Sequence, residues 1–135
     1  MPTAHLYTDA EAAAHPRVAA VFADIRATRN SDFINNFWRA LANQPALLER
    51  TWASLKEVMV APGTLDPLTK ELIYIAVSTI NACTYCIHSH TAAARAKGMS
   101  DDQHAELLAV IGMASETNAI ANALQIPVDP EFQVT

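Results

Sequence analysis

Residues 66–98 read DPLTKELIYIAVSTINACTYCIHSHTAAARAKG and predict two consecutive helices with a short break between them. Asp66 followed by Pro67 is a typical N-cap with proline in the first helical position. Gly98 is a typical residue just beyond a helix C-terminus. Asn81 interrupts the stretch, so we expect one helix over residues 66–79 and a second over residues 83–97.

A reversal of the chain near Asn81 makes these two helices a central antiparallel pair. Glu71 lies ten residues before Asn81 and His90 lies nine after it. At about 1.5 Å per residue, both lie roughly 14–15 Å from the turn and therefore level with each other. The first of these helices is apolar on most sides, so we expect it to be central and buried on most sides. Glu71 is the one acid in its apolar run ELIYIAVSTI, and a buried carboxylate needs a partner. We expect Glu71 to face His90.

The rest of the chain is also punctuated as helices, and no alternating strand pattern is present. Four further features are expected: a helix over 16–28, a short helix capped by Asp32, a helix opened by Pro45 that reaches Met59, and a final helix that begins at the Ser100/Gln103 capping box and extends through Ile120. Residues 61–65 are a breaker loop and residues 126–135 an irregular tail. The prediction is an all-α fold in one domain, residues 1–135, with most of the aromatic residues Phe33, Phe37, Trp38 and Trp52 in the core.

Composition excludes several classes of protein. The 135 residues are 51% hydrophobic and 17% charged, which fits a globular chain. Net charge is −5 and the nine Lys and Arg are scattered, so nucleic-acid binding is not expected. The N-terminus lacks the pattern of a signal peptide, and no stretch is expected to approach the length of a membrane span. We expect a cytoplasmic protein, and there a close cysteine pair is more often redox-active or metal-binding than structural.

The two cysteines of the chain lie three residues apart, next to histidine. At about 100° per residue, Cys86 and His90 fall roughly 300° and 340° from Cys83 and share its face of the helix. His88 falls roughly 140° from Cys83 and points away. A set of Glu71, His90 and Cys86 is therefore predicted, in which a carboxylate orients a histidine and the histidine takes a proton from a thiol.

The thiolate is the reactive form of cysteine, and both a helix N-terminus and a neighbouring imidazole favour it. Cys83 is predicted at the helix N-terminus, while Cys86 has both the first turn and His90. Either cysteine could attack a substrate, and the other would then be placed to close a disulfide.

The spacing of Glu71, Cys83, Cys86 and His90 resembles the E-x(11)-C-x-x-C-x-x-x-H pattern of AhpD-like (alkylhydroperoxidase D-like) proteins. These belong to the carboxymuconolactone decarboxylase superfamily. The motif region covers roughly residues 55–120, and NNFWRALANQPALLERTW at residues 35–52 is also similar to small members of it.

The resemblance implies an all-helical fold, homo-oligomers (trimers or hexamers) and thiol-dependent reduction of hydroperoxides without a cofactor or metal. It implies that Cys86 becomes the sulfenic acid, that Cys83 resolves it from a more open position, and that His90 and Glu71 form a proton relay. An external dithiol would reduce the disulfide. One position departs from the family pattern, because Tyr85 stands where the best-known branch has histidine directly before the second cysteine.

Four other interpretations are weighed against this one. A structural disulfide over so short a loop would stabilise the fold little. A zinc site of Cys83, Cys86, His88 and His90 would place four ligands within little more than a helical turn, which cannot surround a tetrahedral ion. Lactone decarboxylation is disfavoured because that branch generally lacks the cysteine pair. A redox-responsive interaction protein, which uses the dithiol without turnover, stays open.

Overall fold

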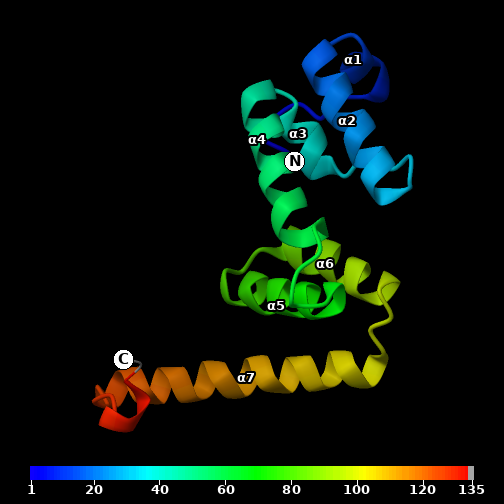
Figure 1. Ribbon diagram of the computed structural model, residues 1–135. Helices are drawn as coiled ribbons and strands as arrows, with labels where there is room; N and C mark the ends of the chain where they lie inside the picture. Colours follow the sequence, from blue (N-terminus) through cyan, green and yellow to red (C-terminus); the bar gives the residue numbers. More distant parts are fainter. Residues whose placement is uncertain (134–135) are drawn as a thin grey trace. The chain divides into compact units, whose positions relative to one another are not determined.

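The computed structural model describes residues 1–133, and its regular elements there are all helices, which confirms the all-α prediction. The chain divides into two compact units, Met1–Pro62 and Gly63 onward, and each is described by itself (Figure 1). The single domain expected over residues 1–135 therefore stays a prediction.

The first unit contains four α-helices and one π-helical turn. These are α1 (Asp9–Ala13), α2 (Pro16–Arg29), α3 (Asn36–Leu41), α4 (Pro45–Leu55) and the π-helical turn η1 (Lys56–Val60). The starts at Pro16 and Pro45 agree with the prediction. Helix α1 was not predicted, although Thr8 and Glu11 form a complete capping box at its start.

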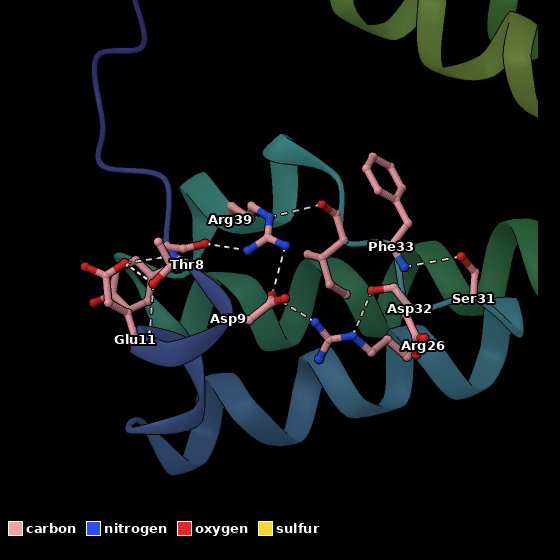
Figure 2. A network of polar contacts seen from close by, with 10 residues as sticks. Thr8, Asp9, Glu11, Arg26, Ser31, Asp32, Phe33 and Arg39 are labelled. Atoms are coloured by element: carbon pink, nitrogen blue, oxygen red, sulfur yellow. Dashed lines mark hydrogen bonds and ion pairs between the residues drawn. The ribbon is translucent and has the colours of Figure 1, made fainter.

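The predicted cap at Asp32 is wrong, because α3 begins four residues later with Asn35 as its N-cap. Residues 31–33 form a turn instead: the Phe33 amide donates to the Ser31 hydroxyl, and Arg26 Nε donates to the Asp32 carbonyl (Figure 2). Phe33 consequently lies outside the helix and is 68% exposed. The core prediction holds for the two tryptophans but not for Phe33 or Phe37, which is 43% exposed.

An apolar cluster and a surface ion network hold the first unit together. The cluster consists of Ala12, Val18, Val21, Phe22, Ile25, Ile34, Trp38, Ala42, Leu48 and Trp52. Trp38 and Trp52 meet edge to face with ring centroids 5.4 Å apart, a favourable geometry for aromatic pairs. At the surface Arg39 donates to the Tyr7 carbonyl and pairs with Asp9, which also pairs with Arg26 (Figure 2). These bonds attach the N-terminal segment to α2 and α3.

Over its described residues, 63–133, the second unit contains three α-helices, α5 (Pro67–Ile80), α6 (Thr84–Ala96) and α7 (Asp101–Leu124), and a 3₁₀ turn, η2 (Pro130–Phe132). Asp66 and Ser100 are the N-caps that the sequence predicts, and they accept from the Thr69 and Gln103 amides. Cys83, predicted at the start of the second helix, is its N-cap and accepts from the Cys86 amide. Gly98, at φ 96°, adopts the left-handed conformation that ends α6.

Helices α5 and α6 pack together as the predicted antiparallel pair. The chain reverses through Asn81 and Ala82, and the Cys83 amide donates to the Ser78 carbonyl at 3.0 Å. Ile75, Ala94 and Met99 form the buried apolar cluster of this unit. The expectation that α5 is buried on most sides is wrong within one copy of the chain, because Ile73, Val77 and Ile80 are each about half exposed or more.

Helix α7 exposes its apolar residues, and within the described chain none of its residues is buried. Leu108, Val110, Met113, Ile120 and Leu124 are each more than half exposed. By length and composition alone α7 could cross a membrane, so the expectation that no stretch approaches such a length is wrong. One such helix is weak evidence for a membrane span, because the core helix of a soluble protein passes the same test of length and composition.

Candidate functional site

The two cysteines meet at the N-terminus of α6 as a disulfide. Cys83 is the N-cap and Cys86 lies in the first turn, with their Cα atoms 5.3 Å apart. The Cys86 amide donates to Cys83 Sγ at 3.3 Å. Both residues are half-buried, so the structure does not rank Cys83 as the more open of the two. The helix N-terminus, whose amides favour negative charge, lies beside both sulfur atoms.

Glu71 is a buried carboxylate on α5, 5% exposed, and each of its two oxygens has its own partner. Oε2 lies 2.7 Å from His90 Nδ1, which is the contact that the hairpin register predicts. Oε1 accepts from Lys97 Nζ at 3.0 Å. His90 lies in the middle of α6, and Lys97 is the C-cap residue of the same helix.

Burial is the largest single influence on the pKa of Glu71 and raises it. The hydrogen bonds and charges of His90 and Lys97 act in the opposite direction and together outweigh burial, so the pKa of Glu71 is lowered from its ordinary value. Glu71 is therefore a carboxylate at neutral pH and accepts hydrogen bonds without donating any.

His90 is held on two sides by α5. Because the ionised Glu71 only accepts, Nδ1 of His90 carries the proton of that hydrogen bond, and Nε2 of the neutral ring is left as an acceptor. Tyr74 stacks on the imidazole with ring centroids 3.6 Å apart and planes 19° apart. The ring orientation is thus fixed at its edge by Glu71 and at its face by Tyr74.

His90 and Cys86 lie one turn apart on α6, which places them on one face of the helix. The predicted residues Glu71, Cys83, Cys86 and His90 all lie on the α5–α6 pair of the second unit. Glu71 contacts His90, and Cys83 contacts Cys86. Their catalytic roles stay predictions.

Two residues of the site were missed by sequence reasoning. Lys97 lies seven residues after His90, a spacing that returns to the same helix face. Tyr74 lies three residues after Glu71, which is also a same-face spacing. The sequence shows which helix face each residue occupies, but it does not show which residue of the neighbouring helix each side chain contacts.

The other histidine of α6, His88, does not join these residues. His88 is exposed, and it lies on the face of α6 away from Cys83 and His90. Among residues 1–133 no group of three or more His, Cys, Asp and Glu side chains is arranged to hold a metal ion. Tyr85, directly before Cys86, is 43% exposed.

Comparison with family models matches residues 46–129 to the carboxymuconolactone decarboxylase family. A solved structure titled as the alkylhydroperoxidase AhpD core from Rhodospirillum rubrum ATCC 11170 is 64% identical. It superposes with a TM-score of 0.98 and covers 100% of this chain and 99% of that one.

Two curated relatives are more distant. Alkyl hydroperoxide reductase AhpD from Solibacter usitatus is 34% identical over 122 residues, which are 89% of this chain and 67% of the relative. Uncharacterized protein 4 in cox locus, from Paracoccus denitrificans, is 34% identical over 74 residues, which are 55% of this chain and 64% of that protein. The chain thus spans about two thirds of the length of each curated relative.

Proposed function

The chain belongs to the carboxymuconolactone decarboxylase family, and we propose that it is a thiol-dependent peroxidase of the alkyl hydroperoxide reductase type. The observation that carries the proposal is the cysteine pair at the start of α6, one turn from an imidazole that Glu71 holds with Nε2 free. The names of the Rhodospirillum and Solibacter relatives point to the same chemistry.

In the first step, the Cys86 thiol gives its proton to Nε2 of His90. The thiolate sulfur then attacks the terminal oxygen of a hydroperoxide, R–O–OH, and the O–O bond breaks. Sulfur retains the hydroxyl as a sulfenic acid, and the departing alkoxide takes the proton from His90 and leaves as an alcohol. Cys86 is oxidised by two electrons and the hydroperoxide is reduced by two.

In the second step, the Cys83 thiolate attacks the sulfur of the Cys86 sulfenic acid. The S–O bond breaks, the departing hydroxide takes up the proton that the Cys83 thiol gave up and leaves as water, and the disulfide forms. An external dithiol then reduces this disulfide by thiol–disulfide exchange and is itself oxidised to a disulfide. A reducing cytoplasm supplies such dithiols, which is why we propose that location.

Glu71 contributes by fixing the tautomer and orientation of His90 and by stabilising the imidazolium that forms when His90 accepts the thiol proton. The N-terminal amides of α6 stabilise the thiolate. Decarboxylation, the reaction in the family's name, neither oxidises nor reduces cysteine sulfur. It therefore does not require a cysteine pair that can form a disulfide.

We propose that the chain acts as a homo-oligomer, a trimer or hexamer. Support comes from the apolar residues that α5 and α7 expose in one copy, including Ile73, Val77 and Leu108. Sedimentation at micromolar concentration should give a multiple of 14.6 kDa. A single 14.6 kDa species would contradict the proposal.

Turnover tests the peroxidase proposal. Purified protein should consume tert-butyl hydroperoxide continuously with dithiothreitol as the dithiol, after subtraction of a protein-free blank. Cys86→Ser should abolish the reaction. Without dithiothreitol, Cys83→Ser should react with one hydroperoxide per chain and retain Cys86 as the sulfenic acid. Reaction of the wild type no faster than free cysteine would reject the proposal and favour a redox-responsive interaction protein, since that role needs the same dithiol but no turnover.

A further inference from the structure

We propose that Lys97 is a positioning residue of the thiol site: its ammonium group holds one oxygen of Glu71, so that the other oxygen stays a charged acceptor for His90. The inference rests on the proposed function, because it takes His90 as the group that accepts the Cys86 proton. It adds to the four motif residues a fifth residue outside the motif.

The geometry gives each donor its own oxygen. Lys97 Nζ lies 3.0 Å from Oε1 of Glu71, and His90 Nδ1 lies 2.7 Å from Oε2. The Glu71 side chain is 6% exposed, whereas the Lys97 side chain is 37% exposed. Lys97 therefore reaches from the surface to a carboxylate that water barely reaches.

A buried carboxylate with too few donors takes up a proton, because burial favours the neutral acid. A protonated Glu71 would no longer attract Nδ1–H of His90 by charge, and the imidazole would lose its electrostatic support. Lys97 opposes this outcome without using the oxygen that His90 needs. The cation also keeps Glu71 ionised whether or not His90 is carrying a proton.

The surroundings of Glu71 leave this task to Lys97. From α6, His90 and Lys97 are the groups that lower the pKa of Glu71, and Tyr74 of α5 stacks on His90. Arg95, the cation two residues before Lys97, pairs with Asp101 at the start of α7. Arg95 and, to a smaller extent, His104 lower the pKa of Asp101. Arg95 is therefore a matched control: a cation two residues away whose partner is outside the site.

The test measures the reactivity of Cys86 alone, in the Cys83→Ser background. Serine is a favoured N-cap residue, so the start of α6 is retained. The reduced protein is alkylated with iodoacetamide from about pH 5 to about pH 9, a range that brackets thiolate formation. Lys97→Met should displace the rising part of the profile to higher pH by about half to one unit, since a nearby opposite charge has effects of this order.

Near pH 6 this displacement makes alkylation of Lys97→Met about 3–10-fold slower, and the profiles should converge at alkaline pH, where the thiolate forms unaided. Lys97→Arg and Arg95→Met should coincide with the parent. In a Glu71→Gln background, Lys97→Met should cause no further displacement, because the carboxylate on which Lys97 acts is gone.

A Lys97→Met profile that coincides with the parent, or that is lowered equally at every pH, would overturn the inference. The inference would also be overturned if Lys97→Met displaced the pH profile by the same amount in the Glu71→Gln background as it does when Glu71 is present. Iodoacetamide requires no peroxidase activity: if hydroperoxide reacts slowly but Lys97→Met still shifts alkylation, the proposed function fails and the positioning role of Lys97 stands.

Discussion

The two units of the chain differ in what they bury. Among the described residues, the first unit buries ten apolar side chains in one cluster, two of them tryptophans. The second unit buries three apolar side chains, Ile75, Ala94 and Met99, together with the carboxylate of Glu71 and the hydroxyl of Ser78. A carboxylate is costly to bury without partners, and the second unit supplies two of them, His90 and Lys97.

The units also differ in their ion pairs. In the first unit, Arg39, Asp9 and Arg26 form a network at the surface, where ion pairs contribute little to stability. In the second unit, Glu71 is buried between His90 and Lys97, where loss of one partner leaves the carboxylate under-compensated. The first unit is thus organised around an apolar core, and the second contains a buried, ion-paired carboxylate.

Removal of Trp38 tests the first half of this comparison and has the largest expected effect. Trp38 is 2% exposed, so Trp38→Ala should lower the free energy of unfolding by about 3–5 kcal/mol, the usual cost of removing a buried large aromatic side chain. Phe33→Ala, at a 68% exposed aromatic of the same unit, should cost about 0.5 kcal/mol or less. Urea titration measures both.

Where Trp38→Ala is still folded, alkylation of reduced Cys86 should proceed at the wild-type rate. A folded Trp38→Ala protein with strongly impaired Cys86 reactivity would break the division of roles between the units.

Removal of His90 tests the second half. His90→Ala should slow the reaction of Cys86 with hydroperoxide at neutral pH by about 10²-fold, the lower end for loss of a general base. The rate should recover in part at alkaline pH, where the thiolate forms without a base. His88→Ala, an exposed histidine two residues away, should react like the wild type. Stopped-flow measures the rate of Cys86 oxidation in each variant. An equal loss of rate in His90→Ala and His88→Ala would refute the assignment of His90.

The smallest expected effect compares two glutamates by their dependence on pH. The pKa of Glu71 is lowered from its ordinary 4.5, so its stabilising contribution is complete above that value and is lost as pH falls through the lower pKa of the folded state. The pKa of Glu11 in the first unit is lowered to about 2, chiefly by the Thr8 amide, with the same sign of effect.

Melting temperatures of Glu71→Gln and Glu11→Gln should therefore approach that of the wild type as pH falls below about 4.5. Only Glu71→Gln should also slow alkylation of Cys86 at neutral pH. A comparable slowing by Glu11→Gln would show that the two glutamates do not differ in role.

The α5–α6 pair was predictable from sequence because its signals are local. Asp66 and Ser100 are N-caps as expected, and α6 starts at Cys83 as expected. The distances of Glu71 and His90 from Asn81 predict their contact. The start of α3 was not predictable in this way, because the Asn35 side chain accepts from Arg29 and the turn at Ser31 replaces a cap at Asp32.

Exposure of helices α5 and α7 also escaped prediction, for a different reason. An apolar pattern such as that of residues 101–124 shows that a face avoids water but does not identify what covers it. Lys97 and Tyr74 were missed because a same-face spacing gives no partner until the neighbouring helix is placed.

Trapping of the sulfenic acid tests the central claim that Cys86 is oxidised first. Reduced Cys83→Ser and Cys86→Ser proteins are treated with one equivalent of hydroperoxide in the presence of dimedone, and the modified residue is identified by mass spectrometry. The account predicts rapid labelling of Cys86 in Cys83→Ser and slow labelling of Cys83 in Cys86→Ser, because Cys86 lies one turn from His90. Labelling of Cys83 as fast as that of Cys86 would contradict it.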